Sequence, residues 1–264
     1  MRLCMMSCMM GRFTPEQIAA TAAACGMEAV DWVSTHHTDP AELRKISEDA
    51  GLRIAAHTML KKKFLQRDAD YLDEFKASLE DACILGAPVL MLPPFPRIQQ
   101  VSLEDDRKAW TEYYAQALPL ARKAGITLTM ESTGIINSPI VTVSEALEVL
   151  HNVPGLKLTL DHGNMQTAED AVDAYSMLKE HVVHIHLKDW KIYDSPHTGA
   201  ALKRNGKYFA NAVIGEGDMD LRMFWEKLDS SGRNLYVNLE TMDFMNPDST
   251  PDVLKHVSKL LKDW

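Results

Sequence analysis

Residues 156–188, LKLTLDHGNMQTAEDAVDAYSMLKEHVVHIHLK, contain a complete strand–helix–strand unit. The apolar run from Leu156 to Asp161 predicts a strand, the segment from Ala168 to Leu178 has helical periodicity, and the run from Val182 to Leu187 predicts a second strand. Two strands connected through a helix pair in parallel. This unit therefore indicates an α/β protein with a parallel sheet.

The same alternation extends over the rest of the chain. Capping residues mark helix starts, as in Thr14-Pro15-Glu16-Gln17, and glycines such as Gly26 mark helix ends. We predict eight strands, each followed by a helix, at residues 2–6, 29–33, 53–57, 89–92, 127–131, 156–161, 182–187 and 235–240. No G-x-G-x-x-G motif follows the first strand, which disfavours a dinucleotide-binding sheet.

The chain length agrees with this alternation. A barrel of eight βα units has ~250 residues, and the chain has 264. We therefore predict the fold class α/β, with one domain over residues 1–264 that forms a single (βα)8 TIM barrel. The predicted strands are unevenly spaced, and the longest connection is an extended loop at residues 188–213, where we expect a lid over the barrel mouth.

Composition and charge narrow the class of protein. The net charge of −9 disfavours binding to nucleic acid. No apolar stretch reaches the ~20 residues of a membrane span, and the four cysteines form no C-x-x-C pair. We expect a cytoplasmic protein without nucleic-acid or membrane partners, and its 15 methionines and apolar helix faces are compatible with a homo-oligomer or a partner subunit.

Several predicted strands end in a charged or polar residue, although parallel barrel strands are buried on both faces. Functional groups of this fold lie at the carboxyl ends of the strands. Because alternate strand residues face the same way, four neighbouring strands direct their last polar residues to a common centre. These residues are Glu131, Asp161, His186 and Glu240.

Three carboxylates at one centre need a counter-charge, and a divalent cation also fixes their geometry. Mixed oxygen and imidazole ligation suits a divalent metal ion. We expect one such ion, with Mn²⁺ as the first choice and Mg²⁺, Co²⁺ and Zn²⁺ as alternatives. A single strand-end histidine is more often a packing residue, but the coincidence of four strand ends favours a metal site.

These residues resemble the xylose isomerase-like sugar isomerases and epimerases, a superfamily that also contains a zinc-dependent abasic-site endonuclease. The resemblance covers essentially the whole chain, and its most specific segments are Asp161-His-Gly-Asn164, His184-Ile-His-Leu-Lys-Asp189, Ile214-Gly-Glu-Gly-Asp218 and Val237-Asn-Leu-Glu240. In the related ketose 3-epimerases, metal ligands lie at the positions of Glu131, Asp161, His186 and Glu240. The resemblance implies that Glu131 and Glu240 also act as acid and base.

The sequence departs from the endonuclease pattern. Asn164, Phe209 and Asn211 stand where that branch carries further zinc ligands, so a trinuclear cluster lacks its ligands. The epimerases typically carry a histidine at the place of Asn164 and an arginine soon after the seventh strand, where this chain has lysines. Substrate orientation is therefore expected to differ in detail.

We expect a divalent-metal-dependent isomerase or epimerase that acts on a ketose or a related hydroxyketone. One glutamate removes the proton next to the carbonyl, and an enediolate forms whose charge the metal offsets. A lyase or dehydratase would share this first step, for example in the cleavage of a 3-keto glycoside. An alternative hypothesis, from a different functional class, is that the protein is a non-catalytic sugar-binding barrel or a regulatory subunit. This hypothesis predicts no bound metal.

Further residues near the strand ends are candidates for binding a small-molecule carbohydrate substrate. Each also has an ordinary structural explanation, such as packing, a solvated loop position or a glycine-containing turn. Asp31 is a weaker site candidate. The basic run Lys61-Lys62-Lys63 with Arg67 and the basic residues of segment 188–213, Lys203 among them, are candidates for recognising a phosphate or carboxylate, with a solvated surface as the alternative. The substrate-binding candidates are His57, Asn164, His184, Lys188 and Glu216.

Overall fold

A computed structural model describes the chain except for residues 60–62, 67 and 98–100. Eight parallel strands form a closed barrel in the order β1-β11-β7-β6-β5-β4-β3-β2. The barrel strands are β1 (Arg2–Met6), β2 (Ala29–Val33), β3 (Arg53–Thr58), β4 (Val89–Met91), β5 (Thr127–Glu131), β6 (Lys157–Asp161), β7 (Val182–Leu187) and β11 (Tyr236–Leu239). The predicted (βα)8 barrel is confirmed.

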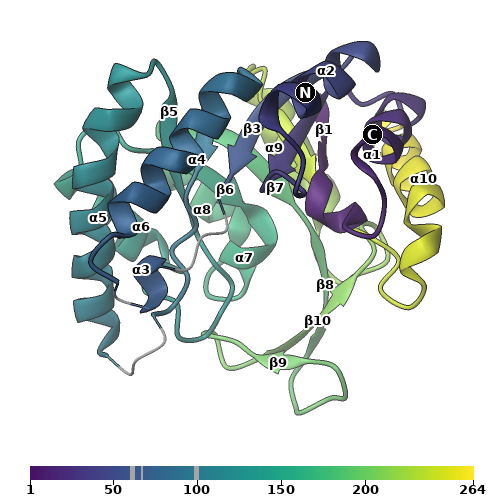
Figure 1. Cartoon of the computed structure of the whole chain (residues 1–264). Helices are drawn as coiled ribbons and strands as arrows, with labels where there is room; N and C mark the ends of the chain where they lie inside the picture. The colour runs from purple at the N-terminus through teal and green to yellow at the C-terminus, as the bar shows by residue number, and fades with distance from the viewer. Residues whose placement is uncertain (60–62, 67, 98–100) are drawn as a thin grey trace.

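Helices surround the barrel (Figure 1). They are α1 (Pro15–Ala24), α2 (Pro40–Asp49), α3 (Lys63–Gln66), α4 (Tyr71–Leu85), α5 (Leu103–Lys123), α6 (Val143–Asn152), α7 (His162–Gln166), α8 (Ala171–Leu178), α9 (Leu221–Ser230) and α10 (Thr250–Lys262), with 3-10 turns η1 (Ser7–Met10) and η2 (Pro247–Ser249). Thr14 and Thr142 form capping boxes at the starts of α1 and α6. None of the described helices is long and apolar enough to cross a membrane.

Segment 188–213, which we expected as an extended loop, contains a small antiparallel sheet. Its strands are β8 (Asp189–Tyr193), β9 (Ala201–Leu202) and β10 (Tyr208–Ala212), in the order β8-β10-β9. The sheet projects beyond the barrel at the lower edge of Figure 1. Its strands were not predicted, because their short alternating pattern is hard to separate from a loop rich in lysine, tyrosine and glycine.

The barrel interior is partly polar below the strand ends. The hydroxyls of Thr129 on β5 and Thr159 on β6 lie 2.9 Å apart, and both side chains are buried. The strand register aligns Asp161 with His186 and His186 with Asn238. The inward-facing residues of four neighbouring strands thus form layers, with the charged layer at the mouth.

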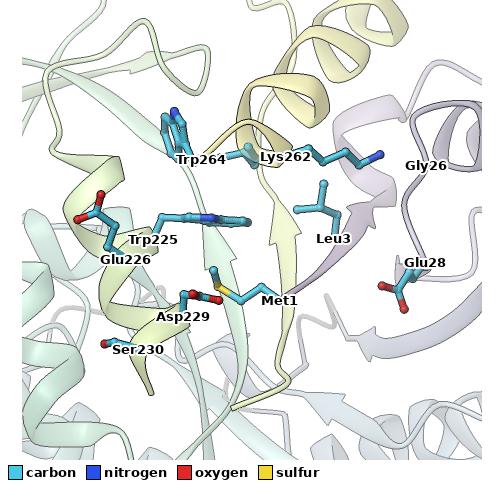
Figure 2. A pocket seen from close by; sticks show the side chains of 11 residues that line it. Met1, Leu3, Gly26, Glu28, Trp225, Glu226, Asp229, Ser230, Lys262 and Trp264 are labelled. Carbon is cyan, nitrogen blue, oxygen red and sulfur yellow. The ribbon is translucent and has the colours of Figure 1, made fainter. Parts of the chain in front are cut away.

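A cavity of about 410 Å³ lies near the amino-terminal ends of β1 and β2. Trp225 from α9 and Trp264 at the chain end border it together with Met1 and Leu3, as Figure 2 shows. The indole rings of the two tryptophans meet edge to face, with centroids 6.2 Å apart. This cavity borders the opposite ends of the strands from the charged layer.

Candidate active site

Four adjacent strands bring together the residues expected as metal ligands. One ligand atom from each of Glu131, Asp161, His186 and Glu240 lies within 4.8 Å of the others. The Nδ1 atom of His186 lies 2.7 Å from Glu131 Oε1 and 3.9 Å from Glu240 Oε2. Glu240 follows the last residue of β11, where its backbone amide donates to the Leu187 carbonyl at 2.9 Å.

Lys188 provides positive charge to this carboxylate cluster. Its Nζ atom lies 2.9 Å from Asp161 Oδ2 and 2.6 Å from Glu240 Oε1, and it also donates to Asn164 Oδ1 at 3.2 Å. Burial alone would lower the pKa of Lys188, but Asp161, Glu240 and Glu131 outweigh it and raise that pKa. Lys188 is therefore a buried ammonium held by the carboxylates of Asp161 and Glu240.

The surroundings move the pKa values of two carboxylates in opposite directions. Burial raises the pKa of Asp161 well above its usual value, although Lys188 opposes this effect. Burial also acts to raise the pKa of Glu240, but Lys188 and His186 outweigh it and lower that pKa. The two groups thus differ in proton affinity, a property typical of acid–base sites.

Asp31 lies one layer below this cluster. Its Oδ2 atom is 3.6 Å from His186 Nε2 and 3.8 Å from His184 Nε2. Thr58 Oγ1 donates to Asp31 Oδ1 at 3.1 Å, and Asn238 Nδ2 donates to Asp31 Oδ2 at 3.0 Å. Asp31 is fully buried, so its carboxylate is held in a fixed orientation against the two imidazoles.

The two histidines of β7 have opposite electrostatic surroundings. Burial and the neighbouring His186 lower the pKa of His184 to about 4. Burial would also lower the pKa of His186, but Glu131 and Asp31 outweigh it and raise that pKa to about 10. His184 lies deeper in the barrel, as its position in the strand predicts, and only His186 reaches the cavity.

The donor set fits a divalent cation. Three carboxylates and one imidazole converge within 4.8 Å, which is a mixed oxygen and nitrogen set suited to ions such as Mn²⁺ or Zn²⁺. Asp161 Oδ2 is buried and has the Lys188 ammonium, 2.9 Å away, as its partner. His186 directs Nδ1 toward Glu131 and Glu240, and its buried Nε2 makes no hydrogen bond within the described part of the chain. A histidine that binds a metal through one nitrogen commonly directs the other to a carboxylate, and Asp31 is in that position.

A cavity of about 280 Å³ opens onto this cluster. One wall is mostly apolar and comes from segments that follow β1, β2 and β4, including Cys8, Val33, Pro93 and Phe95. The opposite wall is polar and comes from the loop after β5, from α7 and from the small antiparallel sheet. Its residues include Thr133, Gly134, Asn164, Lys188, Trp190 and Lys203.

Of the other substrate-binding candidates, two line the cavity and two do not. Asn164 and Lys188 line it. The buried His57 is hydrogen-bonded through Nδ1 to the Trp32 carbonyl at 2.8 Å and does not line it. Glu216 is exposed in the turn before α9 and does not line it either. Of the basic run, Lys61, Lys62 and Arg67 lie outside the described residues.

Residues 19–264 match the model of the xylose isomerase-like TIM barrel family. The chain belongs to this family. No curated protein sequence matches the chain significantly. The family assignment agrees with the resemblance inferred from the strand-end residues.

Solved structures of xylose isomerase-like barrels share the fold at low sequence identity. The probable 3-DHS dehydratase AsbF from Bacillus anthracis is 18% identical, with a TM-score of 0.77 and coverage of 99% of both chains. A zinc-bound IolI protein is 15% identical, with a TM-score of 0.78, and the match covers 99% of this chain and 96% of the IolI chain. A D-psicose 3-epimerase is 16% identical, with a TM-score of 0.76, and the match covers 100% of this chain and 97% of the epimerase chain.

Sequence reasoning missed Trp190 as a contributor to the cavity, and it named Lys203 only as one of several basic residues of segment 188–213. Both belong to segment 188–213, whose internal sheet was not predicted. Asp31 was rated a weak candidate, although a charged residue within the apolar run Ala29-Val-Asp-Trp-Val33 is itself a signal. Its partners on β3, β7 and β11 become visible only in the closed barrel.

Proposed function

We propose that this protein is a divalent-metal-dependent isomerase or epimerase for a ketose or a related hydroxyketone. The observation that carries the proposal is the placement of Glu131 and Glu240 next to the Nδ1 atom of His186, with ligand atoms of all three and Asp161 within 4.8 Å. Two carboxylates beside one small cavity are suited to moving a proton at a carbon next to a carbonyl.

The proposed metal ligands are Glu131, Asp161, His186 and Glu240, with Mn²⁺ as the first candidate. A divalent ion bound there would polarise a substrate carbonyl and make the neighbouring C–H more acidic. Glu131 and Glu240 are the proposed base and acid, which take the proton and return it. Return to the opposite face of the same carbon gives epimerisation, and return to the neighbouring carbon gives isomerisation between aldose and ketose.

The polar wall of the cavity orients the substrate in this proposal. Lys188 and Asn164 line the cavity beside Glu240, within reach of a substrate hydroxyl or of a developing negative charge on oxygen. Pro93 and Phe95 supply an apolar surface on the other side, which limits access of water to the reacting carbon.

Replacement of either glutamate tests the assignment. In Glu131→Gln and Glu240→Gln we expect the exchange of the substrate α-proton with solvent to fall by at least about a hundredfold, because general acid–base groups contribute factors of this size. The measurement is deuterium uptake in D2O, followed by NMR on a panel of ketoses with Mn²⁺ present.

Glu226→Gln serves as the matched control, since Glu226 is on the outer helix α9 and pairs only with Arg222 within the described part of the chain. This variant should keep the wild-type exchange rate. If both active-site variants also keep that rate, Glu131 and Glu240 are not the acid and base.

A dehydratase or lyase that uses the same cluster is the second candidate. It is favoured by the position of Lys188, whose ammonium lies between Asp161 and Glu240 at the cavity and can stabilise negative charge on the oxygen of a leaving hydroxyl. Mass spectrometry of the products separates the two candidates. A product that lacks one water or a larger fragment indicates elimination, and a product of unchanged mass indicates isomerisation or epimerisation.

A further inference from the structure

The polar wall of the cavity contains two lysines beside one tryptophan. The Nζ atoms of Lys188 and Lys203 lie 5.5 Å and 5.2 Å from the centre of the Trp190 ring. The ring itself is fixed, because its Nε1 donates to the Gly163 carbonyl at 2.9 Å. All three side chains line the cavity that opens onto the carboxylate cluster.

Lys203 differs from the other basic residues of segment 188–213 in its partners. Lys188, Lys191, Arg204 and Lys207 each form an ion pair, with Asp161, Asp218, Glu145 and Asp194 among their partners. Lys203 forms no ion pair with the described residues, and its Nζ donates to the Gly134 carbonyl at 2.6 Å. A partly buried ammonium without an anionic partner is unfavourable, and a ligand anion would relieve this cost.

The position of Lys203 is set by neighbouring contacts across the barrel mouth. Arg204 donates to the carbonyls of Ile136 and Ser138, at 3.2 Å and 2.7 Å. The Asn205 amide donates to the Thr167 carbonyl at 3.0 Å. These contacts attach the turn after β9 to the loop after β5 and to the end of α7, so the ammonium is held in place before a ligand binds.

A phosphate fits this chain less well than a carboxylate. TIM barrels frequently bind phosphate at the loops after the seventh and eighth strands, through backbone amides. Here the amides of Gly215 and Gly217 donate to Asp189 Oδ2, at 3.0 Å and 2.8 Å. The amide of Met219 donates to Asp189 Oδ1 at 3.4 Å. Among the described basic residues of segment 188–213, Lys203 is the one without a carboxylate partner, and its one charge matches a carboxylate rather than a doubly charged phosphate.

We propose that Lys203, with Trp190 and Lys188, forms a subsite for a carboxylate group of the substrate, which makes that substrate a keto sugar acid. This inference rests on the proposed function, because it assigns the carboxylate to the molecule whose carbonyl lies at the metal cluster. The small cavity, about 280 Å³, agrees with a ligand of monosaccharide size. Lys203 is the residue that distinguishes the acid from its neutral counterpart.

Isothermal titration calorimetry of the Mn²⁺-loaded protein tests the subsite. The probes are the four D-ketohexoses, their 6-carboxylates and their 6-phosphates. We expect at least one carboxylate to bind at least about tenfold more tightly than its neutral ketohexose. Lys203→Met should remove this difference, and Lys203→Arg should keep most of it, because it retains the charge.

Lys207→Met is the matched control, since Lys207 is on the same hairpin but pairs with Asp194 outside the cavity. It should leave the preference for the carboxylate unchanged. Unfolding temperatures of all variants confirm that they are folded. The proposal is overturned if no carboxylate binds more tightly than its neutral counterpart, if the 6-phosphates bind more tightly than the carboxylates, or if Lys203→Met keeps the preference.

The binding measurement tests the carboxylate subsite, and the solvent-exchange measurement tests the proposed function, so each proposal can be contradicted without the other. Loss of the proposed function would appear as absent α-proton exchange for every probe, whatever its charge. If the carboxylate subsite does not exist, acids and neutral sugars bind equally well, even in a protein that exchanges the α-proton.

Discussion

Asp31 shows how a residue that does not reach the cavity can act on one that does. Its carboxylate faces the Nε2 atom of His186, while the Nδ1 atom of the same ring faces Glu131. Thr58 and Asn238 hold the carboxylate from two other strands. Asp31 is thus placed to fix the ring orientation and the tautomer of His186, the proposed metal-binding histidine.

Replacement of Asp31 should therefore weaken metal binding. In Asp31→Asn we expect the affinity for Mn²⁺ to fall by about 10- to 100-fold, the range found for such supporting carboxylates. Calorimetric titration of the metal-free protein measures this affinity without any need for turnover. Thr58→Val, which removes one hydrogen bond and keeps the carboxylate, should have a smaller effect, and an unchanged affinity in Asp31→Asn would leave Asp31 a packing role only.

The positions of the strand-end residues were predictable. For Lys203 the sequence indicated a basic loop residue but did not single it out from its neighbours or place it at the cavity. Side chains along a strand point alternately to the inside and the outside of the barrel. The convergence of Glu131, Asp161 and His186 therefore follows from the sequence once the barrel is assumed. Lys203 reaches the cavity only because its turn is attached to the loop after β5. Contacts between segments that are distant in the sequence leave no periodic signal.

At the scale of elements, the carboxylate of Asp189 organises the turn between β10 and α9. It accepts hydrogen bonds from the backbone amides of Trp190, Gly215 and Gly217, and a longer one from Met219. Buried backbone amides need such partners. Sequence reasoning named Glu216 in the Gly-Glu-Gly turn as a substrate-binding candidate, with a purely turn-forming role of the glycines as the alternative, and Glu216 is exposed.

A side chain at Gly217 should disturb this turn. A Cβ atom there would overlap the Asp189 carboxylate, so Gly217→Ala should lower the free energy of unfolding by about 1–3 kcal/mol through crowding and loss of hydrogen bonds. Urea denaturation measures this value. Gly11→Ala is the control, since its backbone is helical and the nearest atom to a new Cβ is 3.4 Å away; equal effects of the two substitutions would contradict this explanation.

At the scale of the whole molecule, the candidate metal centre joins four neighbouring strands of the barrel. Glu131, Asp161, His186 and Glu240 come from β5, β6 and β7 and from the residue after β11. A ligand that binds only the folded chain stabilises it by mass action. Binding of a divalent ion at the proposed centre is therefore expected to raise the stability of the whole barrel.

Addition of Mn²⁺ should raise the unfolding temperature. At a metal concentration of about 100 times the dissociation constant the gain is about 2.7 kcal/mol, which corresponds to roughly 5–10 °C for a chain of this size. Differential scanning calorimetry with and without EDTA measures the shift. Asp161→Asn should show a much smaller shift, while Asp229→Asn on α9 should behave as wild type, and a wild-type protein without any shift would argue against a metal at this site.

The small antiparallel sheet is continuous in the sequence, and its strands pair only with one another within the described part of the chain. The metal-ligand candidates, in contrast, come from strands spread between residues 131 and 240. Exchange of one insert, β8 to β10, would alter a wall of the cavity and leave the four strand ends in place. Under the proposed function, this separation means that mutation confined to the insert can change the range of substrates while the proposed metal ligands and acid–base residues keep their positions.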